Sequence, residues 1–368
     1  MGRQLDKLTI RGFKSIRELD GFELQNLNVF VGANGAGKSN LLSFFRMLRS
    51  LIDGSLSDYV RESGGISDLL HNGRKATDEM YFETRFGPRG YRFTLKPGPS
   101  EDFALSDEAR YYAHGTTGWW QLGSSGTDQS LLVEEAKGSS RDSRFSRPVY
   151  DAIRSWVVYH FHDTSPTAGM RHAEIVEDHE VLRSDAANIA PFLAHLRDEE
   201  EDVYKEIVNV CKLVTPFLDD FLLKPQKLGP KTKVALSWKT KGSDYPMQPY
   251  HLSDGSIRFI CMATALLQPD PPSSLIIDEP ELGMHPEAIR ILGELITSAA
   301  KETQLIIATQ SPLLLDQFAI EDVIVVNREE GQSTFDRMQE DEFAVWLQDY
   351  SVGELWTKNV IAGGTRHE

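Results

Sequence analysis

Long apolar runs are absent from this sequence, which excludes a helix that spans a bilayer. Such a helix needs about 18 consecutive apolar residues, whereas the longest apolar run, residues 259–267, reaches about half that length. Residues 1–10 alternate charged with apolar side chains and contain no signal-peptide core. We therefore expect a cytoplasmic protein that has no membrane partner.

Cysteine is scarce as well, and the two that are present, Cys211 and Cys261, lie in apolar stretches of helical character. A buried, reduced thiol is the ordinary state of such residues in an intracellular protein. One disulfide could join the two in principle, but nothing in the sequence favours it.

Positive charge is in deficit, because 39 Lys and Arg face 55 Asp and Glu and leave a net charge of −16. This balance argues against a histone-like protein and against a polybasic membrane binder. It does not exclude nucleic acid, since a total hides local patches. Internal repeats and sustained heptads are also missing, so we expect no long coiled-coil arms.

Strand and helix patterns alternate towards the end of the chain, which predicts a parallel sheet covered by helices on both faces. Between 54 and 147, frequent Gly and Ser and the alternating runs 80–86 and 90–95 predict a β-rich insertion. The stretches 98–108 and 123–127 have no periodicity and are expected to be loops. The other expected strands span 5–11, 26–31, 155–161, 275–278, 305–309 and 323–326. The expected helices span 40–51, 256–267 and 286–300, and the stretch 185–214 is expected to be mostly helical.

A phosphate-binding loop is predicted at residues 32–39, which fit the pattern G-x-x-x-x-G-K-[ST] between an apolar strand and an amphipathic helix. Its glycines let backbone N–H groups turn towards phosphate oxygens, and the helix N-terminus adds a favourable dipole. Lys38 is expected to bridge the β- and γ-phosphates of ATP, and Ser39 to give a hydroxyl to Mg²⁺. The alternative is a chance glycine-rich turn. The residues expected to contact the nucleotide here are Asn34, Gly35, Ala36, Gly37, Lys38, Ser39 and Asn40.

Two acids, Asp278 and Glu279, follow the apolar run 274–277. Ligands bind at the carboxyl ends of the strands in parallel sheets, so both carboxylates are expected near the phosphates. Asp278 is predicted to hold the Mg²⁺ ion, and Glu279 to orient and deprotonate the attacking water. A solvated strand end is the alternative for this pair of acids taken alone.

A third motif, Leu-Ser-Asp-Gly-Ser-Ile-Arg at 252–258, opens the expected helix that precedes these acids. With residues 10–15 and the Pro-Glu-Leu-Gly-Met-His-Pro run at 280–286, it makes the chain resemble the ABC-type ATPases of the SMC, RecF and OLD group. The resemblance covers roughly residues 1–50 and 250–330. Within that group the chain is similar to stand-alone AAA-family ATPases of the OLD-like kind, which lack a Toprim domain.

The resemblance implies an α/β fold, an ABC-type P-loop NTPase head with a mixed, mainly parallel sheet, a β-rich insertion and a helical subdomain. It also implies that Lys14, in the opening motif, contacts the nucleotide. The implied segments are 1–53 (the first part of the ATPase lobe), 54–154 (the insertion), 155–250 (a helical second lobe), 251–330 (signature, Walker B, D-loop and switch) and 331–368 (C-terminal tail elements).

The mechanism that the resemblance implies is a homodimer of two heads that sandwich ATP. Ser253 and Gly255 of one head would meet the γ-phosphate held by the other, since a hydroxyl and N–H groups at a helix start can bind an anion. The alternative is an ordinary Ser-capped helix start. Gln310 stands where the group often has a His; it can hydrogen-bond but does not titrate, so turnover is expected to be slow. Lys38, Glu279 and Gln310 are the expected catalytic residues.

The residue of the group's Q-loop cannot be assigned, because no Gln follows the expected strand 155–161. His160 and His162 lie there at a spacing that puts both on one face of a strand. A structural role for them is favoured over a catalytic one, and a zinc site is rejected because no third ligand has a suitable spacing.

Two basic stretches, Lys224–Lys241 and Lys137–Arg147, oppose the net charge and could neutralise DNA phosphates. A solvated hairpin face is the alternative. Trp119 and Trp120 could stack on bases, although a core or interface pair is favoured.

The expected function is an ATP-driven sensor or scaffold for a separately encoded effector, a nuclease or toxin, in genome defence or DNA repair. The alternative is a RecF-like repair or clamp ATPase that binds DNA without an effector. A transporter subunit is disfavoured because the signature and the insertion differ from transporter heads. A small-molecule kinase has no use for the signature motif.

Overall fold

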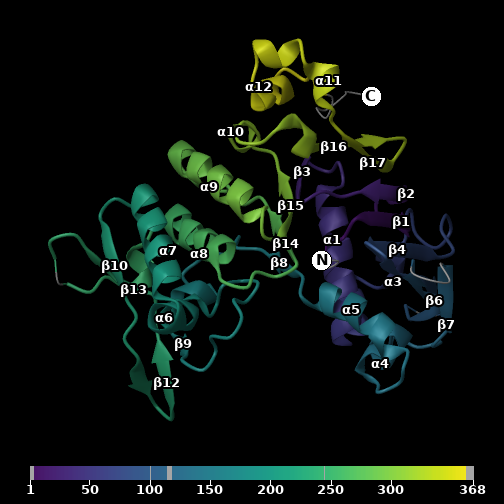
Figure 1. Ribbon diagram of the computed structural model, residues 1–368, viewed down its shortest axis with the longest axis horizontal. Coiled ribbons are helices and arrows are strands. Elements are labelled where there is room, and N and C mark those ends of the chain that lie inside the picture. The colour runs from purple at the N-terminus through teal and green to yellow at the C-terminus, as the bar shows by residue number, and fades with distance from the viewer. Residues whose placement is uncertain (1–3, 100, 114–117, 244, 362–368) are drawn as a thin grey trace.

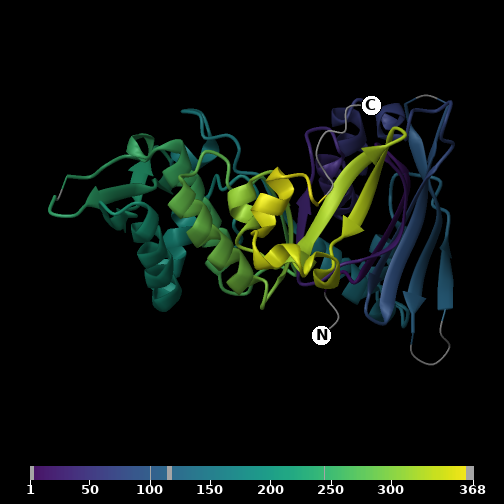
Figure 2. The ribbon, with the colours of Figure 1, turned by 90° about the horizontal axis from the view of Figure 1, so that it is seen from above.

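The computed structural model of the chain describes residues 4–99, 101–113, 118–243 and 245–361 (Figure 1). The outer ends of the predicted segments 1–53 and 331–368 therefore lie partly outside the described residues. Seen from above, the blue antiparallel sheet and the teal-green second lobe lie at opposite ends of the molecule, with the central sheet between them (Figure 2).

The central sheet has the strand order β17-β16-β3-β15-β14-β8. All neighbours pair in parallel except the edge strand β17, which pairs with β16 in the antiparallel sense. This confirms the predicted mixed, mainly parallel sheet. The strands are β3 (Leu27–Val31), β8 (Val157–Tyr159), β14 (Ser274–Asp278), β15 (Gln304–Thr309), β16 (Val323–Glu329) and β17 (Gln332–Arg337).

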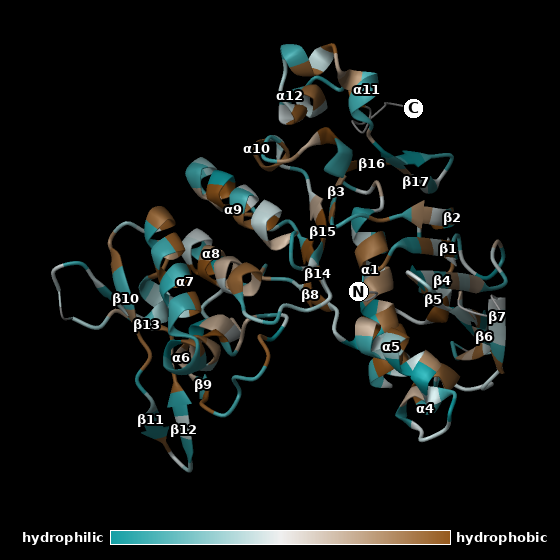
Figure 3. Ribbon diagram, in the orientation of Figure 1, coloured by the Kyte–Doolittle hydropathy of each residue, from teal (hydrophilic) through white to brown (hydrophobic). Residues whose placement is uncertain are grey.

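Successive residues of these strands face two separate cores, because side chains alternate across a sheet. On β15, Ile307 faces one core and Ile306 the other, and both are fully buried. The first core is covered by α8 (Asp254–Leu267) and α9 (Pro286–Ala299), the second by α1 (Lys38–Asp53) and α5 (Ser143–Arg154). Burial on both faces explains the unbroken apolar runs of the sequence, which appear as brown ribbon along β14 and β15 in Figure 3.

The predicted insertion does not form a sheet of its own. Its strand β4 pairs with β1 of the N-terminal segment, with Ile10 opposite Phe82, so the boundary at 53 divides one sheet. The order is β2-β1-β4-β5-β6-β7. The strands are β1 (Lys7–Phe13), β2 (Ile16–Glu23), β4 (Met80–Phe86), β5 (Arg89–Pro97), β6 (Phe103–Tyr112) and β7 (Gly118–Gly123).

The prediction of a loop at 98–108 is wrong for residues 103–108, which form the first part of β6. A buried carboxylate hid this strand from the sequence pattern. Glu108 is fully buried and accepts hydrogen bonds from the Tyr91 hydroxyl at 2.6 Å, the Ser130 hydroxyl at 2.7 Å and the Leu131 N–H at 3.0 Å. The insertion also carries the helices α2 (Leu56–Glu62), α3 (Ile66–Leu69), α4 (Leu131–Lys137) and α5.

The second lobe combines two helices with short strands. The stretch 185–214, expected to be mostly helical, contains two helices, separated at Glu200. Cys211 and Cys261 are buried and free, as predicted, and burial raises the pKa of the Cys261 thiol to about 12. The elements are η1 (Gly169–Arg171), β9 (Glu174–Ile175), α6 (Ile189–Glu199), α7 (Glu201–Val214), β10 (Leu218–Leu222), β11 (Gln226–Leu228), β12 (Lys231–Val234), β13 (Ser237–Thr240) and η2 (Pro249–His251).

The C-terminal part crosses the predicted boundary at 330, because β16 and β17 form one hairpin around it. Between β15 and β16 lie α10 (Pro312–Leu315) and η3 (Ile320–Asp322), and after β17 come α11 (Glu340–Phe343), η4 (Trp346–Gln348) and α12 (Val352–Thr357). Within the described ranges, no helix combines the length and the apolar composition that a bilayer crossing requires.

Gln304 joins the N-terminal strand region to the central sheet. It is buried at the start of β15, and its amide oxygen accepts from the Leu5 N–H at 3.2 Å and the Ser274 hydroxyl at 3.0 Å. Its amide nitrogen donates to the carbonyl oxygens of Leu5 at 2.8 Å and Gln25 at 3.0 Å.

Replacing Gln304 with Ala should therefore destabilise the fold, because the Leu5 N–H, the Leu5 carbonyl and the Ser274 hydroxyl each lose a buried hydrogen bond. We expect the free energy of unfolding in urea to fall by about 2–4 kcal/mol, since each unsatisfied buried group costs about 1–3 kcal/mol and some relaxation follows. Gln339→Ala, at an exposed position, is the control and should change it by less than about 0.5 kcal/mol. If both substitutions changed the free energy of unfolding equally, Gln304 would not be the residue that joins the N-terminal region to the central sheet.

Candidate functional site

The predicted phosphate loop connects β3 to α1 and holds Lys38 in a buried position. The Lys38 ammonium donates to the carbonyl oxygens of Gly32 at 2.5 Å and Ala33 at 3.3 Å. Burial lowers the pKa of Lys38, and the nearby carboxylates of Glu279, Asp278 and Glu281 oppose that shift. Within the described residues no side chain caps α1, so the first N–H groups of the helix remain available to an anion.

Two serines support this loop from outside it. A Cβ atom on Gly37, whose φ is 118°, would lie 2.0 Å from the Ser333 hydroxyl and 2.8 Å from the Ser15 hydroxyl. These hydroxyls are 2.7 Å apart, and that of Ser333 donates to the Ala36 carbonyl at 2.6 Å. Glycine is therefore required at 37. Ser333 carried no signal in the sequence, because β17 is nearly 300 residues from the loop that it supports.

The remaining predicted nucleotide contacts divide into two groups. Asn34, Gly35 and Ser39 are exposed at the loop and the helix start. In contrast, the Asn40 amide donates to the Ser15 hydroxyl at 2.7 Å, and the Lys14 ammonium donates to the Ser43 hydroxyl at 3.1 Å. Burial lowers the pKa of Lys14. The protein itself engages these two side chains.

The predicted acids lie at the carboxyl end of β14, next to the end of β15. The Glu279 N–H donates to the Ala308 carbonyl at 2.8 Å, and the Gln310 amide donates to the Glu279 carboxylate at 2.7 Å. Glu279 has a left-handed φ of 42°, a conformation that costs roughly 1–3 kcal/mol outside glycine. Burial raises the pKa of Asp278, and the charge of His162 opposes that shift.

A third acid, Glu281, was not predicted to belong to the site. Its carboxylate accepts from the Thr309 hydroxyl at 2.5 Å, and that hydroxyl accepts from the Ser311 N–H at 3.0 Å. Its second oxygen is buried without a hydrogen-bond partner among the described residues. Burial raises the pKa of Glu281. Glu281 thus joins the loop after β14 to the end of β15, and its only sequence signal is the third acid in Asp-Glu-Pro-Glu.

The signature motif lies at the start of α8, on the sheet face opposite to α1. Ser253 is exposed and caps the helix by accepting from the Ser256 N–H at 3.1 Å. A Cβ atom on Gly255 would lie 2.5 Å from the Gly283 carbonyl, so the helix start is in close contact with the loop after β14. Within one chain the signature therefore does not meet the phosphate loop.

Two arginines that sequence reasoning missed fix the signature. The buried Arg258 donates to the carbonyl oxygens of Phe161 at 2.8 Å and His162 at 3.1 Å, and also to that of Leu282. Arg171 donates to the Pro249 carbonyl at 2.7 Å and pairs with Asp254 at 2.7 Å. Arg258 stood inside the recognised motif, but its partners could be identified only from the fold.

The argument that placed His160 and His162 on one strand face is wrong, because β8 ends at Tyr159. Both histidines are exposed in the segment that follows. This segment is tied to α8 by Arg258, and the charge of His162 acts on the pKa of Asp278. The residues after β8 therefore border the site, although Gln is not among them.

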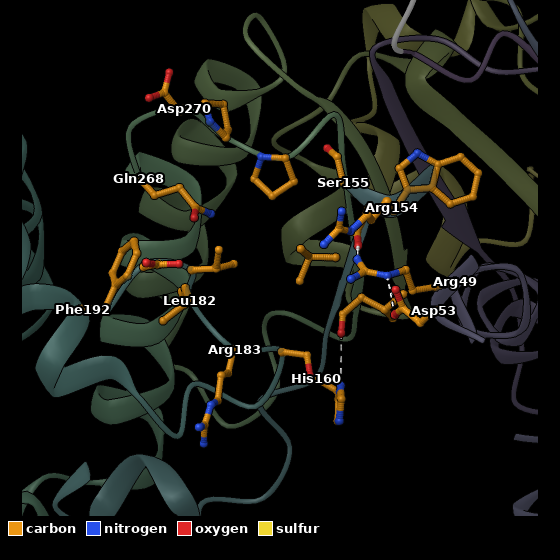
Figure 4. Close-up of a pocket in the computed structure, with 18 of the residues that line it drawn as sticks. Arg49, Asp53, Arg154, Ser155, His160, Leu182, Arg183, Phe192, Gln268 and Asp270 are labelled. Carbon is orange, nitrogen blue, oxygen red and sulfur yellow. Dashed lines mark hydrogen bonds and ion pairs between the residues drawn. The ribbon is translucent and has the colours of Figure 1, made fainter. Parts of the chain in front are cut away.

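A cavity of about 920 Å³ is lined by residues of α1, α6 and the segments around β8 and after α8 (Figure 4), and no residue of the phosphate loop is among its described lining residues. Arg49 lines it and donates to the Asp53 carboxylate at 2.8 Å and to the Trp156 carbonyl at 2.6 Å. His160 lines it as well. None of the predicted catalytic residues is among its described lining residues.

The two basic stretches differ in whether their charged side chains are exposed or engaged by other groups of the protein. In the first, residues 224–232 form an exposed hairpin, while Lys239 pairs with Asp219 at 2.7 Å. In the second, Lys137 lies over the Tyr150 ring, and Arg147 donates to the Ala136 carbonyl at 3.2 Å.

Neither tryptophan of the predicted pair is in the core. The guanidinium groups of Arg85 and Arg92 both lie over the Trp119 ring, at 4.4 Å and 4.6 Å from its centroid. Trp120 is 47% exposed.

A family model described as "AAA domain, putative AbiEii toxin, Type IV TA system" matches residues 27–316 of the chain. The match runs from β3 to α10 and includes the phosphate loop, the signature, the acids after β14 and Gln310. No curated protein matches the sequence.

Two solved structures have a similar fold. The first is an SMC head bound to the C-winged helix domain of ScpA, with 16% identity and a TM-score of 0.56, covering 92% of this chain and 99% of that one. The second, derived from Pyrococcus furiosus, is an SMC head with an extended coiled coil bound to the C-terminal domain of ScpA. It has 16% identity and a TM-score of 0.51, and covers 94% of this chain and 99% of that one. At this identity the likeness shows the fold.

Replacing Glu281 with Gln should make the fold more stable above its ordinary pKa of 4.5. Because the folded chain binds the proton of Glu281 more tightly than the unfolded chain, the free energy of unfolding falls as pH rises from 4.5 towards the raised pKa. Because Gln resembles the protonated acid and does not titrate, the variant avoids this fall in the free energy of unfolding. The free energy of unfolding in urea at pH 8 should therefore be larger for the variant than for the natural chain. This difference should shrink as the pH approaches 4.5.

The exposed Glu342 provides the control, since Glu342→Gln should leave the pH dependence of stability unchanged. A Glu281→Gln variant that is less stable than the natural chain at pH 8, or equally altered at every pH, would contradict the assignment.

Proposed function

The chain belongs to the AAA domain family whose model it matches, and from this premise we propose that it binds and hydrolyses ATP as one head of a homodimer. One observation carries the proposal. Lys38, Asp278, Glu279 and Gln310 gather at the carboxyl ends of three parallel strands, while Ser253 is exposed on the other side of the sheet. A second copy is needed to bring a signature to this site.

The residues present fit Mg²⁺ and the phosphates of ATP. The uncapped start of α1 and the open space at Gly35, where an added Cβ atom would meet no described atom within 4 Å, leave room for phosphate oxygens beside backbone N–H groups. Ser39 and Asp278 would hold Mg²⁺, which neutralises phosphate charge when it is bound. Lys38 is held by its own loop and would exchange those carbonyl contacts for phosphate oxygens.

Glu279 is the proposed general base for the attacking water. One of its carboxylate oxygens accepts a hydrogen bond from Gln310. When Gln310 turns to the γ-phosphate or to the water, it frees this oxygen to accept the proton. Because Gln does not titrate near neutral pH, Gln310 orients groups and passes no proton. Slow turnover follows from this arrangement.

The exposed apolar side chains near the site support pairing of two heads. Tyr250 precedes the signature, Leu282 lies in the loop after the acids, and Leu313 follows Gln310. All three side chains are large and exposed, and each belongs to a segment next to a site motif. A facing copy would remove them from water, as at the apolar centre of other protein interfaces.

We propose further that the paired heads act as a sensor or scaffold for a separately encoded effector, a nuclease or toxin, in genome defence or DNA repair. The family description names a toxin of a toxin–antitoxin system, and the two SMC heads of similar fold bind a domain of another protein, ScpA. Both findings support a role that involves a protein partner.

Replacing Glu279 with Gln should trap an ATP-bound dimer, because binding is retained while the base is lost. Light scattering with ATP should give twice the mass of the nucleotide-free chain, and ATP hydrolysis should fall by roughly 100-fold or more. The Lys38→Ala control should neither bind ATP nor dimerise. Ser253→Arg should bind ATP but stay monomeric. Normal hydrolysis by Glu279→Gln, or an unchanged rate in Ser253→Arg, would overturn the sandwich.

A second function, direct DNA binding in a RecF-like repair or clamp ATPase, is favoured by the hairpin of β11 and β12. Lys224, Lys227 and Lys231 are exposed there, and the sequence from 224 to 241 contains no acid. The hairpin extends from the second lobe, far from β14 and β15 (Figure 3). Its charge suits a duplex backbone.

Reversing the charges of Lys231 and Lys233 to Glu should weaken DNA binding and lower its salt dependence. We expect the slope of log K against log salt to fall by about 0.9 for each phosphate that the variant no longer neutralises. Lys75→Glu with Lys301→Glu, both at exposed sites outside the hairpin, is the matched control. An unaltered affinity and slope in the hairpin variant would show that the hairpin does not bind DNA.

A further inference from the structure

A short segment near the C-terminal end, residues 339–350, combines acids with apolar side chains and contains no Lys or Arg. It follows β17, includes α11 and η4, and precedes α12. We call it the acidic–aromatic segment. Figure 1 shows α11 at the upper edge of the molecule, beside α12. Neither nucleotide binding nor the DNA hypothesis assigns it a role.

The apolar residues of this segment divide into an inner and an outer set. Phe343, Leu347 and Tyr350 are partly buried and pack against the core that contains α8 and α9. Val345 and Trp346 are exposed, at 76% and 46%. The inner residues fix the segment to the fold. The outer two place apolar surface in water, a cost that a partner would remove.

The charge of the segment selects the partner. Glu340, Asp341, Glu342 and Asp349 are all exposed, and no ion pair involves them in the part of the chain that the structure describes. The Lys358 ammonium lies over the Tyr350 ring at 4.9 Å and forms no ion pair with these acids among the described residues. The resulting negative potential repels nucleic acid and anionic lipid, and attracts a basic protein surface. Trp is one of the residues most enriched in binding hot spots.

The segment is also connected to the switch residue Gln310. Ser311 caps α10 by accepting from the Leu314 N–H at 3.3 Å. From the other side, the Gly353 N–H of α12 donates to the Asp316 carboxylate at 2.7 Å, and a Cβ atom on Gly353 would lie 2.2 Å from the Pro312 carbonyl. Because α12 directly follows the segment and is in such close contact with α10, a displacement of either helix reaches the other.

We propose that the acidic–aromatic segment is the docking surface for a partner protein whose contacting face is basic and apolar, such as a cationic amphipathic helix. Val345 and Trp346 bury its apolar side, and the four acids pair with its cations. Docking acts through α12 and α10 on Gln310, so the partner senses and alters the nucleotide cycle. The inference rests on the proposed ATPase function for this last step only, since docking itself needs no nucleotide.

The test uses the full, nucleotide-free chain and a fluorescent amphipathic peptide of about 18 residues, with leucine on one face and lysine on the other. Fluorescence anisotropy should show binding of this peptide. The same peptide with glutamate in place of lysine should not bind, and an oligolysine of equal charge should bind at least about tenfold more weakly, since burial of Trp346 is worth more than about 1.4 kcal/mol.

Two pairs of matched variants locate the surface. Trp346→Ala should weaken binding by at least about tenfold, whereas Trp120→Ala, at 47% exposure, should not change it. Glu340→Lys with Asp341→Lys should abolish binding, whereas Glu62→Lys with Glu206→Lys, the same charge change at other exposed sites, should not. The docking surface is overturned if the peptide binds Trp346→Ala as tightly as the natural chain. It is also overturned if oligolysine binds the natural chain as tightly as the peptide does. A nucleotide-free dimer that is lost in Trp346→Ala assigns the surface to a second copy and also overturns it.

The connection to the switch has its own readout. Saturating peptide should change the rate of ATP hydrolysis in the natural chain, and Asp316→Ala should remove this effect while the peptide still binds. An unchanged rate in the natural chain, or the same effect in Asp316→Ala, overturns the connection. Lys38→Ala should bind the peptide normally, so loss of ATP hydrolysis and loss of docking are separate results.

Discussion

Parallel pairing of β3, β15 and β14 is the constraint on which the site depends. The register sets Val31 opposite Thr309 and Asp278 opposite Ala308, so the phosphate loop, the acids and the switch all begin at one level of one sheet edge. Burial of the sheet on both faces then places α1 and α8 in different cores. The same pairing that assembles the phosphate site therefore separates it from the signature of its own chain.

Several ionisable side chains of this site are buried, where their charged forms are less stable than in water. Burial lowers the pKa of Lys38 and raises those of Asp278 and Glu281, so the charged form of each group is disfavoured. Triphosphate oxygens would stabilise the ammonium, and a divalent cation would stabilise the carboxylate of Asp278. The strained backbone of Glu279 is held by its hydrogen bonds to β15 and Gln310. The fold thus keeps the site ready for a ligand that satisfies these groups.

Local patterns predicted the central sheet, the helices on it and the motif residues, because strand burial and loop chemistry leave short-range signals. Partners far apart in the sequence could not be predicted. Ser333 supports Gly37, and Arg258 holds the carbonyl of Phe161, yet neither residue type suggests its partner. Glu108 obscured the middle of β6, since a buried carboxylate appears in the sequence as a loop residue. The pairing of β4 with β1 likewise crosses some 70 residues that carry no register signal.

The central claim is that each active site is shared between two chains. The most direct measurement mixes two inactive variants, Lys38→Ala and Ser253→Arg, and follows ATP hydrolysis. A mixed dimer contains one intact site, made from the phosphate loop of the Ser253→Arg chain and the signature of the Lys38→Ala chain. The account predicts that the mixture hydrolyses ATP although neither variant does so alone. A mixture that stays inactive, with both variants folded, would contradict it.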